Sequence, residues 1–458
     1  MLLRFICENF KSFRNETEFS MVASKITRHA SHVALCNGRR VLRGAYMFGA
    51  NAGGKTNFVK AIDFARHVVV EGLERTNCDR MHFLLSPVGK ENRVGRFQFD
   101  IYANGRFYSY GFAIDYFAIE IVGEWLLSID NSSNETYLFS RMKDETGNTV
   151  IETDCNYQGD EKKRFDVYKE DMKRSGMRRT LFLSDVAKRS SNTEDFSSRF
   201  LDVFSWFKDL IVLFPETRFT GIPSFVHDDS SRLQYSEWLR HFDTGIDSLI
   251  AQDVSLDKCW DCISDKDREQ FKTDVFRLLS SNQDAPAIAV NYKGSYFCFY
   301  TTNEGTKAKK IVASHGRNDV PFEREEESEG TQRLFDLLPF IPLMRKNRVV
   351  VIDELDRSLH TKATLEFIRL FYGDATNSNS QLIATTHDGE LLDLDQVRQD
   401  EIWFVERNDE KCSSLYSLSK FKTRFDKDIR KDYLLGRYGA LPVFGIIQDA
   451  REDKHDSE

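Results

Sequence analysis

The sequence predicts an α/β fold, in which a mixed β-sheet carries a helix and is interrupted by an inserted helical lobe. Apolar runs at residues 2–7 and 45–48 are typical of strands, and alternating aromatic residues on both sides of Asn104-Gly105 predict a hairpin. Apolar side chains recur at helical spacing over residues 57–70. From about residue 161 to 279 the pattern becomes helical and charged, which indicates the inserted lobe.

The order of these patterns predicts where the chain divides. Within the helical region, residues 233–250 read as one amphipathic helix, and the sheet resumes after residue 311. We therefore expect four segments. They are residues 1–130 (the first half of the sheet domain with a glycine-rich loop), 131–310 (the inserted helical lobe), 311–448 (the second half of the sheet domain) and 449–458 (an acidic tail).

Composition excludes several classes of protein. The 458 residues hold 64 Lys and Arg against 72 Asp and Glu, a formal charge of −8, which argues against a surface that binds nucleic acid all round. Eight cysteines scattered over this length are not a disulfide framework. No run approaches the roughly 18 uncharged apolar residues of a membrane span. We expect a cytoplasmic protein that is not bound to a membrane.

The glycine-rich loop carries the clearest chemical signal. Residues 49–56 read Gly-Ala-Asn-Ala-Gly-Gly-Lys-Thr and fit the pattern G-x-x-x-x-G-K-[ST], with a strand before and a helix after. Glycines let backbone N–H groups turn inward around a phosphate at the positive end of a helix. Lys55 adds a charge for the β- and γ-phosphates, and the Thr56 hydroxyl can bind magnesium. The loop predicts a nucleotide site.

A second signal is a strand that ends in two acids. Residues 348–354 read Arg-Val-Val-Val-Ile-Asp-Glu, and four β-branched residues in a row fit a strand buried on both faces. Ligands of open α/β sheets bind at the carboxyl ends of such strands. We therefore expect Asp353 to hold the magnesium or its water, and Glu354 to polarise an attacking water.

Two further features each allow two interpretations. His387 follows an apolar run at residues 381–385, where it can donate to a γ-phosphate or serve as an ordinary polar cap. Upstream, Ser328, Gly330 and Thr331 open a helical-looking segment, which gives either an anion-binding helix end or a simple N-cap.

These pieces, in this order, resemble the ABC-type ATPase head. Within that superfamily the sequence is similar to the SMC/OLD-like bacterial AAA ATPases of anti-phage defence. The likeness lies in the opening strand (FICENFKSF), the phosphate loop (GANAGGKTN), the ABC signature (ESEGTQRL), the Walker B strand with its D-loop (VVVIDELDRSLH) and the switch segment (IATTHD). The closing segments EIWFVERN, LYSLSKFK and YLLGRYGALP also resemble the end of that family, so the likeness spans nearly the whole chain.

The resemblance implies ATP and Mg²⁺ as cofactors and assigns residues to them. The implied nucleotide loop consists of Gly49, Asn51, Gly53, Gly54, Lys55, Thr56 and Asn57. Thr56 and Asp353 become the magnesium ligands, Glu354 the catalytic base and His387 the γ-phosphate sensor. Ser328 and Gly330 would reach across a dimer to the ATP of the other subunit. The signature departs from L-S-G-G-Q, because Glu329 stands where a glycine would.

The resemblance also implies partners. ATPases of this kind form homodimers or larger homo-oligomers that share ATP sites, so ATP binding changes assembly. Chains of this size resemble the ATPase components of the PARIS, AbiL, Septu and retron-type systems. Those act with a separate effector, such as a Toprim-, HNH- or RloB-like nuclease. The likeness therefore suggests an ATPase that serves as sensor and scaffold and lacks nuclease activity of its own.

Two alternatives stay open. The first is an SMC- or repair-like clamp that traps DNA when the dimer closes, although the insertion is too short for a long coiled coil with sustained heptads. The second is a nuclease that uses ATP only for regulation. Residues 161–189 carry ten Lys or Arg against five acids, so they could contact DNA or an acidic protein, or form a solvated helical face.

Overall fold

The computed structural model divides the chain into two compact units. It describes all residues except 87–91, 145, 191–195, 219–227, 262–263, 282–286, 293–294, 318–319, 345, 374–378, 424–426 and 443–458. The first unit comprises Met1–Val212, Val351–Asp353 and Gln381–Glu458, and the second comprises Leu213–Val350 and Glu354–Ser380. The expected acidic tail, residues 449–458, lies outside the described residues.

The first unit is built on β-sheets. One has seven strands in the order β10 (Thr149–Glu152), β9 (Glu135–Lys143), β8 (Glu120–Ile129), β7 (Arg106–Asp115), β6 (Val94–Ala103), β1 (Leu2–Glu8) and β2 (Thr17–Ser20). A second has six strands in the order β11 (Ile211–Leu213), β16 (Val349–Ile352), β17 (Gln381–Thr385), β5 (Gly44–Phe48), β18 (Ile402–Arg407) and β19 (Ser413–Ser417). A small ribbon pairs β3 (Val33–Cys36) with β4 (Arg39–Leu42).

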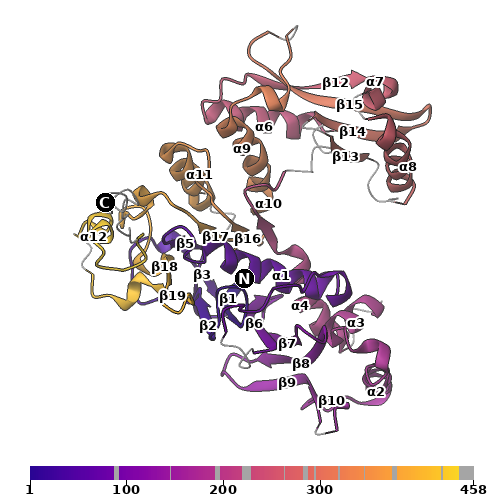
Figure 1. The fold of residues 1–458 in the computed structure, drawn as a ribbon, viewed down its shortest axis with the longest axis vertical. Coiled ribbons are helices and arrows are strands. Elements are labelled where there is room, and N and C mark those ends of the chain that lie inside the picture. The colour runs from indigo at the N-terminus through magenta and orange to yellow at the C-terminus, as the bar shows by residue number, and fades with distance from the viewer. Residues whose placement is uncertain are drawn as a thin grey trace, which may run out of the picture. The chain divides into compact units, whose positions relative to one another are not determined.

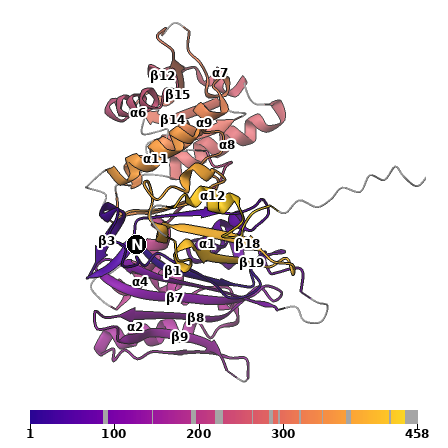
Figure 2. The ribbon, with the colours of Figure 1, turned by 90° about the vertical axis from the view of Figure 1, so that its left-hand side faces the viewer.

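Five α-helices and several 3₁₀ helices complete the described part of this unit. The α-helices are α1 (Lys55–Val70), α2 (Gly159–Asp171), α3 (Phe182–Arg189), α4 (Ser197–Asp209) and α12 (Ile429–Leu434). The 3₁₀ helices are η1 (Ala30–His32), η2 (Leu73–Arg75), η3 (Ser175–Met177), η7 (Gly389–Leu391), η8 (Gln399–Glu401) and η9 (Leu418–Lys420). Figure 1 shows α1 between the six-stranded and the seven-stranded sheet, and Figure 2 shows β7, β8 and β9 side by side in the latter.

Aromatic packing fixes α1, the helix that follows the glycine-rich loop. The Phe58 ring meets Phe5 of β1 and Phe19 of β2 at centroid distances of 5.7 and 5.2 Å. Six residues further on, Phe64 meets Phe10 and Phe97. Phenylalanine rings therefore form much of the contact between α1 and the seven-stranded sheet. Because the glycine-rich loop leads directly into α1, this contact also fixes the end of the loop.

The second unit combines a four-stranded antiparallel sheet with helices. Its strands run in the order β12 (Ser248–Val254), β15 (Gly305–Ser314), β14 (Ser295–Thr302) and β13 (Ala287–Tyr292). Its helices are α6 (Asp229–His241), α7 (Leu256–Asp261), α8 (Asp265–Ser281), η4 (Arg324–Glu326), α9 (Glu329–Leu337), η5 (Leu338–Phe340), α10 (Ile341–Met344) and α11 (Thr361–Gly373). Trp260 stacks on Phe299 with an interplanar angle of 2°, inside the core of this sheet.

Several expectations are confirmed. The helix expected over residues 57–70 is α1, which begins two residues earlier. The Asn104-Gly105 turn joins β6 to β7, and both residues have positive φ (46° and 81°), as the hairpin requires. The strands expected at residues 348–352 and 381–385 are β16 and β17, and both are wholly buried.

The bounds of the two compact units differ from the bounds of the expected segments. We expected the lobe to start at residue 131, whereas the first unit continues to Val212. A buried ion pair at the centre of this part of the unit reaches beyond the sheet: Glu124 of β8 lies 3.6 Å from Arg141 of β9, and both also bond residues after β10. The Glu124 carboxylate accepts the backbone N–H of Phe182 at 2.6 Å, and Arg141 donates to the Thr180 carbonyl at 2.6 Å. These long-range bonds tie the start of α3 to the seven-stranded sheet.

The helix expected over residues 233–250 was wrong in its second half. Helix α6 ends at His241, and β12 begins at Ser248 and pairs with β15. Between them Asp243 and Gly245 have positive φ (55° and 78°), which ends the helix. The apolar residues of β12 happen to continue the helical spacing, so pattern alone joined the two elements.

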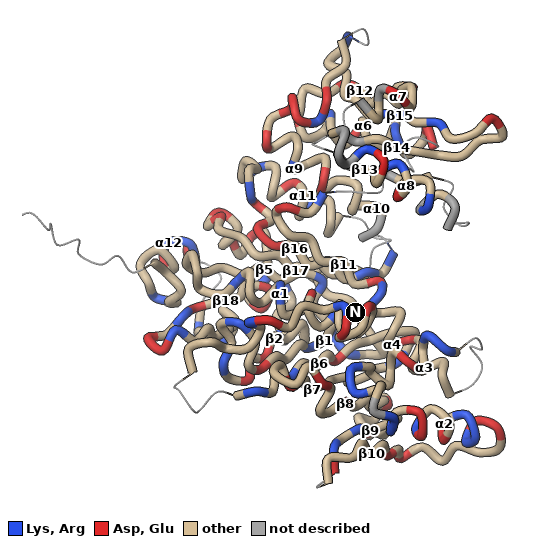
Figure 3. Tube along the Cα trace, turned by 45° about the vertical axis from the view of Figure 1, so that its right-hand side comes forward, with Lys and Arg blue, Asp and Glu red and all other residues tan. Residues whose placement is uncertain are grey.

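The basic residues 161–189 are interspersed with acids in the structure, as the charges along α2 show in Figure 3. Lys163 pairs with Asp160, Lys173 with Glu170, and Arg189 with both Asp171 and Asp185. These pairs favour the interpretation as a solvated helical face. Among the helices of the described part of the chain, none is both long and apolar enough to cross a membrane.

Phe58→Ala tests the anchoring of α1. We expect the substitution to lower the free energy of unfolding by about 3–5 kcal/mol, because it removes a buried ring between two others. Urea unfolding followed by circular dichroism would measure the change. Val167→Ala is the control, since Val167 of α2 is exposed and its loss should change stability by no more than about 0.5 kcal/mol. Equal effects of the two substitutions would contradict this role of Phe58.

Candidate functional site

The glycine-rich loop lies between the buried strand β5 and helix α1, as the sequence predicted. It begins at Gly49, and Gly54 is the N-cap residue of α1 with φ 121° and no side-chain cap. Ala52 also has positive φ (61°). A strand, a tight loop and the N-terminus of a 16-residue helix make the anion-binding arrangement in which backbone N–H groups face one point.

Two C-terminal strands pack closely against this loop. A β-carbon built on Gly49 would lie 2.3 Å from the carbonyl oxygen of Val405 in β18, and one on Gly53 would lie 2.9 Å from the same atom. A β-carbon on Gly54 would lie 2.3 Å from the hydroxyl oxygen of Ser413 in β19. Close contacts therefore require all three glycines, and the positive φ of Gly54 (121°) requires that one as well.

A chain of hydrogen bonds holds the loop from behind. The Asn57 side-chain amide donates to the Ser12 hydroxyl at 2.9 Å. The Ser12 and Ser413 hydroxyls are 2.7 Å apart, and the Ser413 hydroxyl lies 2.6 Å from the Gly53 carbonyl oxygen. The Ser413 backbone N–H also donates to the Ser12 carbonyl at 2.7 Å. Residues from three distant parts of the sequence thus fix one loop.

Lys55 lies over the loop that precedes it. Its side chain is 5% exposed, and its ammonium donates to the carbonyl oxygens of Gly49 at 2.6 Å and Ala50 at 3.2 Å. The Lys55 nitrogen is 3.5 Å from Nδ1 of His387, which follows β17 and is exposed. The structure therefore brings together two residues that are 332 positions apart and that the sequence assigned to one site.

Asp353 stands at the same edge of the six-stranded sheet. Strand β17 lies between β16 and β5 and is parallel to β5, so the carboxyl ends of β5 and β17 share an edge. The Asp353 carboxylate directly follows β16, is 1% exposed, and accepts the Thr385 hydroxyl at 2.6 Å. A buried carboxylate beside a phosphate-binding loop fits the donor set that Mg²⁺ prefers, together with the Thr56 hydroxyl at the start of α1.

Glu354 belongs to the second unit, where residues of that unit contact its backbone and its side chain. It is a non-glycine residue with φ 49°, in the left-handed region, and its side chain is half-buried. Arg333 of α9 donates to its backbone carbonyl at 3.3 Å, and Arg357 lies 3.8 Å from its carboxylate. Burial lowers the pKa of the Arg333 guanidinium. The conformation of Glu354 is thus held by the helix that the signature opens.

The signature residues start α9 in the same unit. The Ser328 hydroxyl accepts the Thr331 backbone N–H at 3.2 Å, so Ser328 is an N-cap, as one of the two interpretations predicted. A β-carbon on Gly330 would lie 2.8 Å from the carbonyl oxygen of Ser358, which follows Glu354 in the D-loop. The Ser358 hydroxyl donates to Glu329 at 3.2 Å. The signature turn and the D-loop are therefore packed together within one chain.

Sequence reasoning missed the supporting residues Ser12, Ser413, Thr385 and Arg333. Ser12 lies in the opening segment FICENFKSF and Thr385 lies in the switch segment IATTHD, so their positions within motifs were a usable signal. Arg333 lies within the signature segment ESEGTQRL, whereas Ser413 carries no local signal, because its contacts are with residues far away in the sequence.

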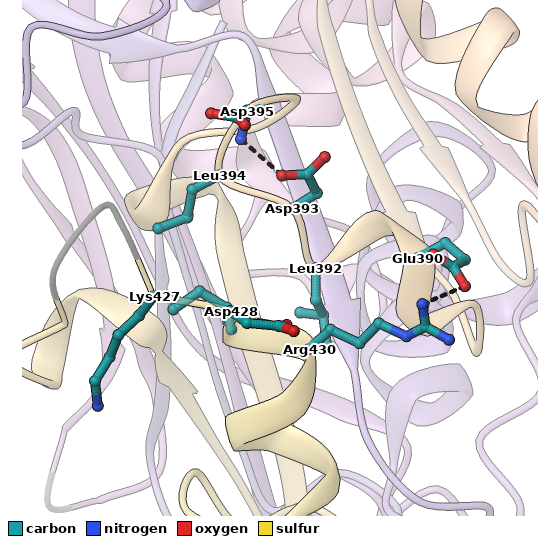
Figure 4. A pocket seen from close by; sticks show the side chains of 9 residues that line it. Glu390, Leu392, Asp393, Leu394, Asp395, Lys427, Asp428 and Arg430 are labelled. Carbon is teal, nitrogen blue, oxygen red and sulfur yellow. Dashed lines mark hydrogen bonds and ion pairs between the residues drawn. The ribbon is translucent and has the colours of Figure 1, made fainter.

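Residues from the segment 390–395, which follows His387, and residues 427–430 line a polar pocket of about 440 Å³ (Figure 4). Its lining includes Glu390, Asp393, Asp428 and Arg430. Arg430 pairs with Glu390, Asp393 accepts the Asp395 backbone N–H at 2.9 Å, and Asp428 caps α12. The protein's own donors thus satisfy these carboxylates, and we assign no ligand to this pocket.

The fold is a mixed α/β domain in which a glycine-rich loop joins the buried strand β5 to helix α1. The chain belongs to the family described as "AAA domain, putative AbiEii toxin, Type IV TA system", which matches residues 45–393, more than half of its length. No curated protein matches the sequence.

Solved structures that resemble the chain include two SMC heads. One is an SMC head bound to the C-winged helix domain of ScpA, with 13% identity, a TM-score of 0.38, and coverage of 91% of this chain and 97% of that chain. The other is the SMC head domain from Thermotoga maritima, with 11% identity, a TM-score of 0.37, and coverage of 91% and 98%.

Gly54→Ala tests the close contact behind the loop. The new methyl group overlaps the Ser413 hydroxyl and forces an L-residue to positive φ, a strain of about 1–2 kcal/mol. We expect the affinity for a fluorescent ATP analogue to fall by roughly tenfold, which corresponds to about 1.4 kcal/mol. Gly176→Ala is the control, because a β-carbon there meets open space. Unchanged affinity in Gly54→Ala would show that the loop tolerates the overlap.

Proposed function

We propose that this chain binds Mg-ATP at the edge of the six-stranded sheet and hydrolyses it to ADP and phosphate. The observation that carries the proposal is the fixed phosphate loop with the Lys55 ammonium above it and Asp353 and His387 at the same edge. The space behind the loop is closed at Gly49, Gly53 and Gly54, so its backbone N–H groups are held for a ligand in front.

Each residue of the site has a role in this proposal. The loop residues Gly49 to Lys55, Asn51 among them, and the neighbouring Asn57 would hold the phosphates. Thr56 and Asp353 would hold magnesium, which when bound neutralises charge on the phosphate oxygens. Glu354 would accept the proton of the attacking water, and His387 would donate to the terminal phosphate.

We propose further that Ser328 and Gly330 complete the nucleotide site of a second copy, so that two chains enclose two nucleotides. The exposed Ser328 at the start of the nine-residue helix α9 supports this, because it presents a helix N-terminus to solvent. ATP binding would then control assembly of a homodimer or larger homo-oligomer, a population shift set by contacts with the γ-phosphate.

In the cell, we propose that this assembly is the sensor and scaffold of an anti-phage defence system in the bacterial cytoplasm. The assembled form would hold and control a separate effector, such as a Toprim-, HNH- or RloB-like nuclease. The family description names a putative toxin of a toxin–antitoxin system, which supports action together with a partner protein. The nuclease activity would belong to the effector and not to this chain.

Glu354→Gln and Lys55→Ala separate binding from hydrolysis. We expect Glu354→Gln to lower the hydrolysis rate by about 10²–10⁴-fold, the usual contribution of a general base, while ATP binding is retained. Lys55→Ala should lose binding as well. Native mass measurement with ATP and magnesium, with and without duplex DNA, should show an assembly of Glu354→Gln that does not depend on DNA. Assembly only with DNA would favour the clamp, and a monomer throughout would contradict a shared site.

Mixed chains test whether the site is shared. Lys55→Ala and Ser328→Arg should each be inactive alone, the first for lack of a phosphate loop and the second for lack of a signature. A mixed dimer pairs the intact loop of one chain with the intact signature of the other. An equimolar mixture should therefore recover about a quarter of the wild-type ATPase rate, since half of the symmetric dimers are mixed and each has one intact site. No recovery would show that the signature does not act across chains.

A further inference from the structure

A histidine holds the segment that leads into the signature helix. His315 follows β15, and its Nε2 lies 2.8 Å from the carboxylate oxygen Oε1 of Glu327, the residue before Ser328. Its Nδ1 lies 2.8 Å from the carbonyl oxygen of Gly245. The ring also meets Phe322 edge-on at 4.9 Å. Both ring nitrogens are thus engaged, and the ring packs against Phe322.

The two hydrogen bonds define the protonation state of His315. A carbonyl oxygen and a carboxylate oxygen both accept hydrogen bonds, and a neutral imidazole has only one N–H to donate. Only the charged imidazolium donates to both partners at once. The Glu327 side chain is 7% exposed, so its charge is little screened by water.

The charged groups around the ring agree with this assignment. Among the described residues, the carboxylates that act on His315 are those of Glu327 and Asp247, and Asp247 approaches the neighbouring Gly316. The hydrogen bond to Glu327, with smaller help from the Gly245 carbonyl and Asp247, raises the pKa of His315 above its ordinary value of about 6.5. The proton is therefore held below that raised pKa and lost as the pH rises through it.

Glu327 passes this constraint to the signature turn. While its carboxylate meets His315, its carbonyl oxygen accepts the side-chain amide of Gln332 at 2.9 Å. The next residue, Ser328, caps α9 through the Thr331 backbone N–H. His315, Glu327 and the first turn of α9 therefore form one connected unit, which we call the signature latch.

We infer that His315 is a positioning residue for the signature: in its charged form it fixes Glu327 and thereby the turn Ser328–Gly330 that completes the nucleotide site of a second copy. This inference rests on the proposed function and adds its regulation. Deprotonation removes one of the two hydrogen bonds and frees either Glu327 or Gly245. Hydrolysis should then fall as the pH rises, while ATP binding by the phosphate loop stays constant.

The test is the pH profile of the ATPase rate between about pH 6 and 9, measured at saturating Mg-ATP. Wild type should lose activity along an alkaline limb that lies above the ordinary histidine value of about 6.5. His315→Gln should lack that limb and run flat, roughly tenfold below the wild-type maximum, as expected for loss of a charged hydrogen bond. Glu327→Gln should shift the limb to lower pH, because it removes the charge that stabilises the imidazolium.

His241→Gln is the matched control. His241 also pairs with a carboxylate in the second unit, Glu366 at 2.6 Å, but it ends α6 and does not adjoin the signature. This variant should keep the wild-type alkaline limb. ATP affinity, measured in the Glu354→Gln background, should not change with pH in any variant, which separates positioning of the signature from a general loss of structure.

The outcomes are distinguishable. If wild type hydrolyses ATP and His315→Gln shows the same alkaline limb, the signature latch is overturned and the ATPase stands. If His315→Gln and His241→Gln lose the limb alike, the effect is not specific to the signature and the inference also fails. If wild type hydrolyses no ATP at any pH, the proposed function itself is wrong.

Discussion

The site depends on one contact, the packing of the phosphate loop against the C-terminal strands β18 and β19. The Val405 carbonyl and the Ser413 hydroxyl leave no room for a methyl group at Gly49, Gly53 or Gly54. Because the loop cannot move backward, its backbone N–H groups are fixed before any ligand arrives, which is the condition for electrostatic stabilisation without reorganisation. The last part of the described chain is therefore as necessary to the loop as the motif itself.

The two neighbouring acids after β16 are held by different parts of the chain. Asp353 is buried in the first unit and accepts the Thr385 hydroxyl, whereas Glu354 begins the next stretch of the second unit and its carbonyl accepts from Arg333. Glu354, the first residue after the part of the chain that belongs to the first unit, has a positive φ of 49°. In the proposed mechanism, the magnesium ligand is thus anchored with the phosphate loop, and the base is anchored with the signature helix.

Expectations from the sequence succeeded where the signal was local. The helix after the loop, the Asn104-Gly105 hairpin and the strands before Asp353 and His387 could all be placed, because each depends on spacing or on residues that favour positive φ. They failed where distant residues decide. Hydrogen bonds from Glu124 and Arg141 to residues 180–183 tie the start of α3 to the seven-stranded sheet, and the pairing of β12 with β15 ends a pattern that looked helical. Neither partner can be found by inspection of its own neighbourhood.

The sequence by itself determined the chemical inventory: a glycine-rich loop with Lys55 and Thr56, a buried strand that ends in two acids, and a histidine after another strand. These are matters of residue type and short spacing, and physical chemistry assigns them to a nucleotide site. Only the tertiary structure decided which atoms meet. It brought Lys55 to His387, Thr385 to Asp353, Arg333 to Glu354 and His315 to Glu327. Such contacts arise because buried polar groups must find partners, and the fold, not the spacing along the chain, supplies them.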